Sequence, residues 1–408
     1  MLPPDQNELL TRVEGDAPMG GMLAQHFWVP ALKSSAVEAD GPPVRVRLLG
    51  RNYVVFRGSD GKVACLDERC PHRGASLVLA RNEKCALRCI FHGWKIEADG
   101  TVSEVPTQTT DPQRFAKSVK VGRYQAREAG GLIWLWLGEG DTPPQFPHFE
   151  FTTLAPERVS IRMATVNFNW FQGVEANQDS SHVGILHRNF VGGLGNLQMM
   201  AQNSTPLYEV AGTPYGYQAV ALRGMADGST YMRITEFVMP WYSLIPPIDM
   251  ADSERMAILA VPIDDRTTNM IYIRYDNEKT VDPEHYQKIL ETEDFKILGG
   301  GEGNNWGQDR DAMKKGNFSG FHNLVLEDIA VQLSMGPIAD RSDEQLCSGD
   351  KAIIQARRLM LRTVQAAKEG TAPPTSGLSQ AEYTAIRSRA DVLPPGADWR
   401  EACGRAEL

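Results

Sequence analysis

The sequence predicts an α+β chain of two domains, the first small and all-β, the second larger and containing helices. Three observations support this fold class. Short segments in which apolar and polar residues alternate, joined by tight turns, run from residue 28 to residue 137. Residues 138–144 have the Gly- and Pro-rich composition of a linker. Helical spacing of apolar residues occurs within residues 5–26 and again within residues 320–335.

The period of the apolar residues predicts the elements of the first part of the chain. Residues 5–26 predict one or two short helices, interrupted at Gly15 and at a pair of glycines. From residue 28 the period is two, and Asp60-Gly61 and Asp99-Gly100 predict hairpin turns. We therefore expect three segments: an N-terminal helical segment at 1–26 that packs on the second domain, the all-β domain at 27–138, and the second domain at 148–408.

The composition excludes several classes of function. The chain has 408 residues, of which 42% are hydrophobic and 23% charged, as expected for a globular protein. A net charge of -9 and a pI near 5.5 argue against a nucleic-acid partner. No apolar run is long enough to span a membrane, and the first residues lack the features of a secretory signal. We expect a cytoplasmic protein.

Two short motifs of the all-β domain carry one cysteine and one histidine each, Cys70-Pro-His72 and Cys89-Ile-Phe-His92. Two thiolates can hold one iron of a [2Fe-2S] cluster while two imidazoles hold the other, which is the Rieske arrangement. Neutral imidazoles raise the potential of such a cluster above that of an all-cysteine ferredoxin. The motifs therefore predict a Rieske [2Fe-2S] cluster bound by these four residues.

Zinc and disulfides are the alternatives for these cysteines. Structural zinc sites usually pair like ligands in C-x2-4-C and H-x3-5-H spacing, which the one-residue gap between Cys70 and His72 fits poorly. Six cysteines in 408 residues without a secretory signal indicate a reducing compartment rather than a disulfide framework. Neither Cys65 nor Cys85 has a histidine two or three residues further on, so both are expected to be packing residues.

A second group of candidate ligands lies beyond the linker. Glu175, Asp179 and His182 are spaced i, i+4 and i+7, so a continuous helix would present all three on one face. Asp179 could then accept a hydrogen bond from the ring of His182. His187 is about 140° further round an ideal helix, so both histidines can bind one metal only if the helix ends or distorts near Gly184. A polar helix face without metal is the alternative.

A Rieske cluster needs a destination for its electrons, which favours a metal at the two histidines. Two histidines and one carboxylate form the facial triad of mononuclear non-haem iron oxygenases. The candidate carboxylate is Asp328, in the predicted helix 320–335. It is the single charge in a helical stripe otherwise formed by Phe321, Leu324, Val331 and Met335. We expect this stripe to be buried, and a buried carboxylate is costly unless it is paired or binds a metal.

Two neighbours of Asp328 are rivals as ligands. Glu327 lies about 100° round the same helix and is expected to be a solvated or hydrogen-bonded neighbour. His322 lies near the helix start beside glycine and serine, where a capping or surface role is expected.

Together, the Cys/His motifs and the Glu175-to-His187 segment resemble the α (oxygenase) subunit of Rieske non-haem iron aromatic-ring-hydroxylating oxygenases, over nearly the whole chain. Residues 327–338 and 340–344 suggest the branch typified by phthalate dioxygenase, with chlorobenzoate and phenoxybenzoate dioxygenases as relatives. The resemblance implies a Rieske domain inserted into a helix-grip catalytic domain, whose antiparallel sheet covers the mononuclear iron and the substrate pocket. It also implies a homotrimer or a stacked hexamer without a β subunit.

The resemblance implies dihydroxylation of an aromatic carboxylate such as a phthalate, chlorobenzoate or phenoxybenzoate, with O2 and with NADH as the electron source. Because the sequence has no GxGxxG fingerprint, electrons are expected from a separate NADH-dependent flavin and iron-sulfur reductase. The resemblance places a mononuclear Fe(II) at His182, His187 and Asp328. A plain Rieske electron carrier would not need the residues beyond about 140. A Rieske monooxygenase or O-demethylase shares every metal ligand and remains an alternative.

The expected substrate and the expected trimer give two further hypotheses. An aryl carboxylate needs a cation in the pocket, and Arg223 or Arg233, on alternating strand patterns, are the candidates. In the resembling family the partner cluster belongs to the neighbouring subunit. Asp179 is then a catalytic residue that accepts hydrogen bonds from His182 and from His92 of the neighbour.

Overall fold

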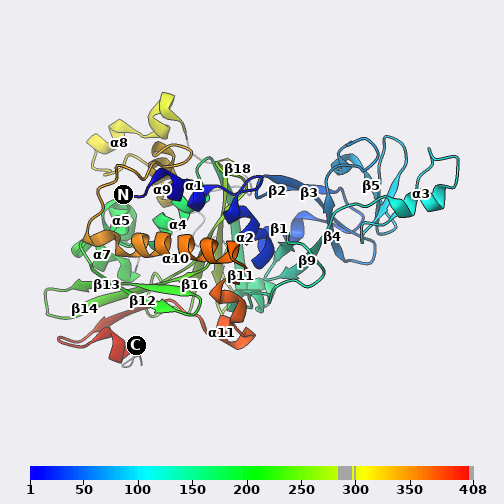
Figure 1. The fold of residues 1–408 in the computed structure, drawn as a ribbon. Helices are drawn as coiled ribbons and strands as arrows, with labels where there is room; N and C mark the ends of the chain where they lie inside the picture. Colours follow the sequence, from blue (N-terminus) through cyan, green and yellow to red (C-terminus); the bar gives the residue numbers. More distant parts are fainter. Residues whose placement is uncertain (194, 284–295, 298–299, 404–408) are drawn as a thin grey trace. The chain divides into compact units, whose positions relative to one another are not determined.

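The computed structural model describes residues 1–193, 195–283, 296–297 and 300–403 (Figure 1). The chain forms two compact units, and each is described separately. The small unit consists of Val13–Asp16 and Gly20–Phe146, and the large unit consists of Met1–Arg12, Ala17–Met19 and Pro147–Leu408. The division after Phe146 follows closely on the predicted linker, residues 138–144.

The small unit contains two antiparallel sheets. The six-stranded sheet has the order β1 (Val29–Lys33), β10 (Leu132–Trp136), β9 (Arg123–Ala129), β4 (Val63–Asp67), β3 (Arg51–Arg57) and β2 (Val44–Leu48). The four-stranded sheet has the order β5 (Arg81–Glu83), β6 (Ala86–Arg88), β7 (Lys95–Glu97) and β8 (Val102–Glu104). Two α-helices, α2 (Pro18–His26) and α3 (Pro112–Ser118), and two short 3-10 helices, Ser34–Ala36 and Leu77–Leu79, accompany the sheets. The predicted all-β character is confirmed, apart from these short helices.

Both predicted hairpin turns are present. Gly61 lies between β3 and β4 with φ at 79°, and Gly100 lies between β7 and β8 with φ at 83°. A side chain is strained at such angles, so the Asp-Gly pairs end the strands where the sequence indicates. In β2 the valine and leucine at 46 and 48 are buried while the two arginines between and before them are exposed, as the period of two predicts.

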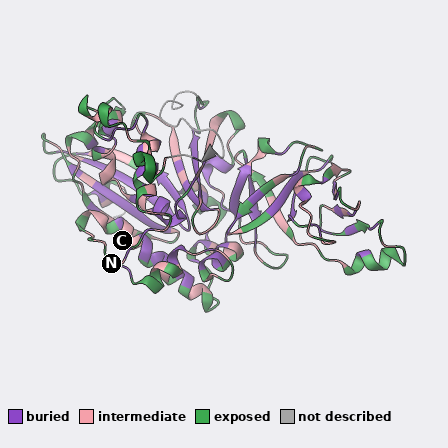
Figure 2. Cartoon of the chain, turned by 90° about the horizontal axis from the view of Figure 1, so that it is seen from above, coloured by how far each residue is buried: buried purple, intermediate pink, exposed green. Residues whose placement is uncertain are grey.

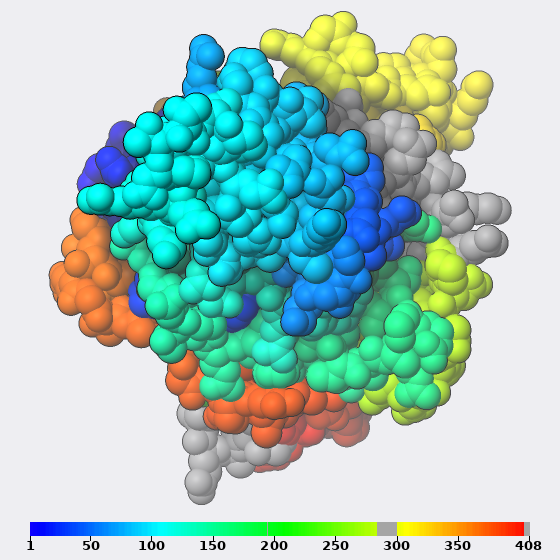
Figure 3. Space-filling view, turned by 90° about the vertical axis from the view of Figure 1, so that its right-hand side faces the viewer, coloured from blue at the N-terminus to red at the C-terminus, as the bar shows by residue number. Residues whose placement is uncertain are grey.

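The two sheets of the small unit share one apolar core. Its members come from β3, β4, β6, β7 and the loops between them, and include Val54, Phe56, Leu66, Leu77, Leu87, Trp94 and Ile96. Figure 2 shows α3 as mostly exposed, whereas the central residues of β3 and β4 are buried. The outer surface over the four-stranded sheet and α3 faces the viewer in Figure 3, in light blue and cyan. Cys70 and Cys89 belong to this core, so the candidate cluster loops are anchored in it.

One large sheet forms the centre of the large unit. Its order is β12 (Leu207–Thr213), β13 (Gly216–Gly224), β14 (Thr230–Val238), β15 (Tyr242–Ile245), β16 (Arg255–Pro262), β17 (Thr268–Tyr275), β11 (Val159–Val166) and β18 (Lys296–Ile297), with β19 (Arg389–Leu393) paired to β14. All pairings are antiparallel except that of β11 with β18. The sheet is strongly buried along β14 and β17.

Helices pack against this sheet and against one another. The helix α4 (Trp170–Gln178) contacts β15, β16 and β17, and α10 (Lys351–Lys368) contacts β12, α4 and α1 (Pro4–Thr11). The helix α9 (Leu324–Ser334) contacts α4. The other helices are short: α5 (Ser181–Ile185), α6 (Arg188–Val191), α7 (Gln198–Gln202), α8 (Arg310–Lys314), α11 (Gln380–Ala385) and α12 (Trp399–Ala402). The predicted antiparallel sheet flanked by helices is confirmed.

The N-terminal segment at 1–26 forms two helices, which is within the expected one or two. It was expected to pack on the second domain, but only α1 belongs to the large unit, and most of α2 belongs to the small unit. Gln25 explains the second assignment, because its carbonyl accepts from Trp136 Nε1 at 2.9 Å and its side chain accepts from the N–H of Glu139 at 2.9 Å. Within the described residues, no helix reaches the length and apolarity that crossing a bilayer requires.

Candidate metal centres and substrate pocket

The two Cys/His loops of the small unit share one backbone frame. In each loop a glycine N–H donates to the carbonyl of the cysteine four residues earlier, from Gly74 to Cys70 at 2.8 Å and from Gly93 to Cys89 at 2.9 Å. Gly74 has φ of 75° and Gly93 of 74°, the left-handed conformation that glycine adopts without strain. The repeated turn buries both cysteine side chains, each at 3% exposure.

The donor atoms of the two loops converge. The Nδ1 atoms of His72 and His92 are 3.1 Å apart, and the thiols of Cys70 and Cys89 lie within hydrogen-bonding reach of each other. Desolvation and the neighbouring His72 lower the pKa of His92, which favours the neutral imidazole that binds metals. Trp94 stacks on His72, with ring centroids 4.8 Å apart. A pair of buried thiols and a pair of facing imidazole nitrogens fit the split ligation of a Rieske cluster.

The other cysteines lie outside this group of donors. All six cysteines are free thiols. Cys65 is buried in β4, and Cys85 lies in the turn between β5 and β6. Cys347 is exposed and Cys403 is half-buried, so neither is held near another cysteine by a disulfide.

The helix expected to present Glu175, Asp179 and His182 on one face ends before Asp179, so that expectation is wrong. α4 stops at Gln178, and Asp179 has extended backbone angles, φ -90° and ψ 107°. Its Oδ1 accepts from the N–H of Ser181 at 2.7 Å, and such a local side-chain bond competes with helix continuation. The chain then forms α5 and α6 with a break between Ile185 and Arg188, which is the interruption that the two histidines require.

Glu175 points to a different partner from the histidines. Its carboxylate pairs with Arg341 Nη2 at 2.7 Å and with Arg357 Nε at 2.6 Å. These contacts join α4 to α10 and to the segment after α9. Glu175 therefore supports the scaffold around the site and lies outside the group of candidate ligands.

The predicted burial of the Asp328 stripe on α9 is also wrong. Val331 is 39% exposed and Met335 is 53% exposed, whereas Glu327 is fully buried at 0%. The buried side of α9 carries Val325, Glu327, Ile329, Ala330 and Gln332, because this side packs into the unit. Asp328 lies at the margin of that side, with 28% of its side chain exposed, and so faces a cavity instead of the core. His322 is exposed next to the N-cap residue Asn323, as expected.

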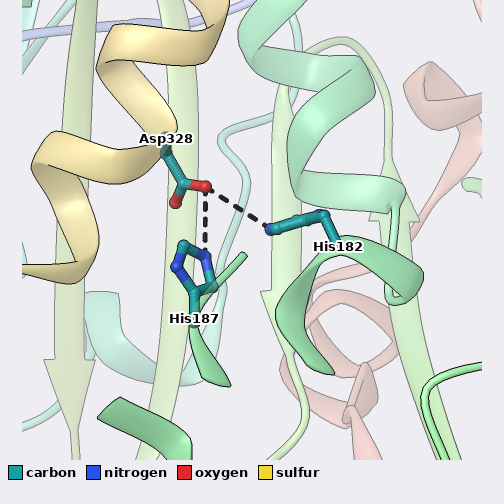
Figure 4. A group of neighbouring side chains, drawn as sticks. All are labelled: His182, His187 and Asp328. Atoms are coloured by element: carbon teal, nitrogen blue, oxygen red, sulfur yellow. Dashed lines mark ion pairs between the residues drawn. The ribbon is translucent and has the colours of Figure 1, made fainter. Parts of the chain in front are cut away.

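His182, His187 and Asp328 form a candidate metal site (Figure 4). Asp328 Oδ1 lies 3.1 Å from His187 Nε2 and 3.5 Å from His182 Nε2. One ligand atom from each residue lies within 4.8 Å of the others. Figure 4 shows the carboxylate entering from α9 and the two rings entering from the α5–α6 region. This donor set has the composition of the facial triad, with open directions towards the cavity.

Carboxylates on both sides make the neighbourhood of His187 favourable for positive charge. His187 Nδ1 donates to Glu327 Oε2 at 2.5 Å, while its Nε2 faces Asp328. Burial alone would lower the pKa of His187, but Asp328 and Glu327 raise it to about 9. Burial likewise disfavours the Asp328 anion, and His187 nevertheless holds the pKa of Asp328 below its usual value. The carboxylates that favour a proton on His187 would also favour a divalent cation bound to its ring, so these residues fit a mononuclear iron.

Asp179 lies beside this candidate site. Its Oδ2 is 3.4 Å from His182 Nδ1, and its Oδ1 also accepts from the Tyr208 hydroxyl at 3.3 Å. Burial raises and these donors lower its pKa, and the net shift is downward, so the ionised form is favoured. Asp179 therefore contacts the back of the His182 ring, on the side opposite Asp328.

A cavity of about 160 Å³ opens beside His182, His187 and Asp328. A cavity of roughly 150 Å³ holds one benzene molecule in another protein, so the space suits a single aromatic ring. Much of the wall is apolar, formed by Leu197, Met200, Ile245, Pro246, Pro247, Ile248, Met256, Ile258, Met270, Leu324, Val325 and Ile329. Charged residues line another part of it: Arg233, Asp249, Asp252, Glu254, Arg255 and Arg274.

The arginines in and near the cavity differ in the hydrogen bonds that their side chains make to the protein. Arg223 is fully buried and holds the carbonyl of Ser180 at 2.7 Å, and it is not among the cavity-lining residues. Arg233 lines the cavity, but its guanidinium donates to the carbonyls of Pro246 and Pro247. Arg255, which the sequence did not suggest, lines the cavity at the start of β16, and its guanidinium makes no hydrogen bond to the described part of the chain.

Comparison with known proteins gives matches in both units. Residues 27–122 match the Rieske [2Fe-2S] domain model, and residues 135–407 match the LigXa C-terminal domain like model. The oxygenase subunit of phthalate 4,5-dioxygenase from Pseudomonas putida is 38% identical, over 98% of this chain and 94% of that protein. The chain belongs to the Rieske non-haem iron oxygenase family. The oxygenase subunit of 3-chlorobenzoate-3,4-dioxygenase from Comamonas testosteroni is 35% identical, over 97% of this chain and 96% of that protein.

Solved structures support the same fold. Pseudomonas putida CBB5 NdmA, as the QL mutant with theobromine, superposes with a TM-score of 0.62 at 20% identity, over 93% of this chain and 99% of that chain. The family models and the relatives show that the protein is an enzyme, an oxygenase subunit whose cofactors are a Rieske [2Fe-2S] cluster and a mononuclear iron. The resemblance inferred from the motifs is confirmed, as is the ring-hydroxylating dioxygenase class.

Proposed function

We propose that this Rieske oxygenase subunit dihydroxylates an aromatic carboxylate, such as a phthalate or a chlorobenzoate, with O2 and with electrons from a separate NADH-dependent flavin and iron-sulfur reductase. The observation that carries the proposal is that His182, His187 and Asp328 line a ring-sized cavity together with Arg255, whose guanidinium makes no hydrogen bond or ion pair to the residues that the structure describes. Relatives that act on phthalate and chlorobenzoate support the substrate class. A homotrimer or stacked hexamer is the proposed assembly.

The ligand assignment follows the donor sets of the two units. Cys70 and Cys89 are the proposed ligands of one iron of the cluster, and His72 and His92 of the other. His182, His187 and Asp328 are the proposed ligands of the mononuclear Fe(II). When bound there, the iron supplies the activation of O2 that organic side chains cannot provide.

The residues of the chain itself supply orientation and exclude water. The apolar wall accepts the ring and keeps it dry, which strengthens polar contacts inside the cavity. Arg255 is the proposed anchor for the substrate carboxylate, because a guanidinium can pair with a carboxylate through two parallel hydrogen bonds. Holding the carboxylate at the charged part of the wall fixes which ring carbons face the histidines.

Product analysis with labelled oxygen tests the reaction type. Incubation of the protein with a compatible reductase, NADH, 18O2 and a panel of aryl carboxylates should give a product that contains two labelled atoms. One labelled atom, or loss of a methyl group as formaldehyde, would instead establish the monooxygenase or O-demethylase alternative. Turnover of neutral aromatics only would refute the carboxylate as the recognised group.

A further inference from the structure

A series of hydrogen bonds starts at the His187 ring and returns to the residues that directly follow His187 in the sequence. The imidazole Nδ1 donates to Glu327 Oε2 at 2.5 Å. The other oxygen of this carboxylate, Oε1, accepts a hydrogen bond from the hydroxyl of Ser319. Both carboxylate oxygens are thus occupied by donors on two different segments, and Glu327 is fully buried between them.

The loop that carries Ser319 is itself held in one conformation. Asn317 Oδ1 accepts from the N–H of Ser319 at 3.1 Å and from the N–H of Gly320 at 2.7 Å. Its side-chain amide donates to the carbonyl of Phe321 at 2.9 Å. Ser319 is 6% exposed, so its hydroxyl is fixed by the protein and is little contacted by solvent.

The same loop is anchored on α6, the helix that starts directly after His187. Asn189 Oδ1 accepts from the N–H of Phe318 at 2.7 Å, and Asn189 Nδ2 donates to the carbonyl of Gly316 at 3.3 Å. The guanidinium of Arg188 lies 4.2 Å from the centre of the Phe318 ring. The path from His187 through Glu327, Ser319 and the 316–320 loop therefore returns to the residues that follow His187.

We propose that Glu327 is the positioning residue of this oxygenase, and that Ser319 and the 316–320 loop, anchored by Asn189, hold it in place. An imidazole that donates from Nδ1 presents the lone pair of Nε2, which is the atom that faces Asp328. A buried carboxylate at Nδ1 fixes the tautomer and the ring plane and makes Nε2 a stronger donor to a metal. The proposal rests on the assignment of His187 as a ligand in the proposed function.

Metal binding tests this role without turnover. The mononuclear site of the full-length protein is emptied with a chelator, the cluster is kept, and Co(II) is titrated back while its visible d–d absorption is recorded. Glu327→Gln keeps the shape of the side chain and removes its charge, and should weaken Co(II) binding roughly 10- to 100-fold with a shifted spectrum. Ser319→Ala, which leaves the carboxylate and frees one of its oxygens, should weaken binding by about 3- to 10-fold in the same direction.

Glu8→Gln is the control, since it makes the same substitution at a largely exposed carboxylate of α1 and should leave Co(II) affinity and spectrum within about twofold of the wild type. Wild-type affinity and spectrum in folded Glu327→Gln would refute the proposal, and so would an unchanged Ser319→Ala if Glu327→Gln does not fold. If Asp328→Ala binds Co(II) as the wild type does, the metal lies elsewhere and the ligand assignment has failed instead.

Discussion

Glu327 and Asp328 are adjacent in sequence, yet they contact opposite nitrogens of the same imidazole. Successive residues on a helix point about 100° apart, so one carboxylate of α9 reaches Nδ1 of His187 from the core while the next reaches Nε2 from the cavity. The fully buried Glu327 carboxylate accepts hydrogen bonds from the His187 ring and from Ser319. The partly exposed member faces the open side, where a metal and its other ligands have room.

Removal of the Asp328 carboxylate should empty the mononuclear iron site and leave the cluster intact. We predict that Asp328→Ala lowers the iron content from about three to about two per chain and abolishes product formation, while the visible spectrum of the cluster is unchanged. The reason is that the candidate ligands of the two sites lie in different units. Iron analysis and absorption spectroscopy measure both effects, with Asp311→Ala on the exposed face of α8 as control. Retention of all the iron together with activity would show that Asp328 is not a ligand.

Arg255 should determine the preference for a carboxylate. Hydrogen bonds to charged groups are worth about 1.5–3 kcal/mol, so Arg255→Met should raise KM for aryl carboxylates roughly 10- to 100-fold. KM for a neutral aromatic of the same size should change little, because the methionine keeps the apolar contacts of the side-chain stem. Steady-state kinetics on matched substrate pairs measure the difference, with exposed Arg266→Met as control. An equal change for both members of a pair would show that Arg255 does not bind the carboxylate.

At the scale of elements, features that depend on local sequence could be predicted, and features that depend on long-range packing could not. The Asp-Gly turns and the alternation in β2 are local, so the small unit was predictable. The end of α4 at Gln178 could not be predicted, because the spacing of Glu175, Asp179 and His182 is the same whether the helix continues through Asp179 or ends before it. Asp328 was selected by a burial argument that is wrong in detail, since the buried side of α9 depends on contacts with α4 that lie far away in sequence. Arg255 and Ser319 carry no local signal at all.

The contacts of Glu175 should make the stability of the large unit sensitive to acid. Glu175 is buried, which alone raises its pKa, but Arg341 and Arg357 hold the pKa below the usual 4.5. Glu175→Gln removes the carboxylate that pairs with fully buried Arg341, while Arg357 keeps its second carboxylate partner, Glu344. Removing one partner of a buried pair costs about 3–5 kcal/mol. The folded carboxylate has the lower pKa, so its contribution is complete above the ordinary pKa and is lost as pH falls through the folded one.

Thermal unfolding at two pH values measures this effect. The midpoint of Glu175→Gln should lie well below that of the wild type at pH 7, and the two midpoints should approach each other as the pH falls below about 4.5. Glu8→Gln is the control, because its i,i+4 pair with Arg12 is largely exposed and contributes little. A difference that is the same at both pH values would assign the loss to packing and not to charge.

At the scale of the whole molecule, the two candidate metal sites are built by separate units with separate cores. The small unit holds the Cys/His loops through its own sheets, and the large unit holds the histidines and Asp328 between α9 and the α5–α6 region. We propose that electrons pass between the two sites in an assembled trimer, from the cluster of one subunit to the large unit of the next, across the contact that joins them.

Asp179 is the residue that should carry that contact. Its Oδ1 already accepts from Ser181 and Tyr208, and its Oδ2 lies 3.4 Å from His182, so Oδ2 has capacity for a second donor such as the Nε2–H of His92 from a neighbouring subunit. Asp179→Asn should keep both metals and the trimer, because the amide oxygen still accepts within the chain. Loss of the charge should slow electron transfer roughly 10- to 100-fold, so that the cluster is reduced but product forms slowly.

Stopped-flow recovery of the oxidised cluster spectrum after mixing with substrate and O2 measures the rate. Asp311→Asn makes the same substitution at an exposed residue of α8 and should react at the wild-type rate. A wild-type rate in Asp179→Asn as well would restrict Asp179 to supporting the turn between α4 and α5.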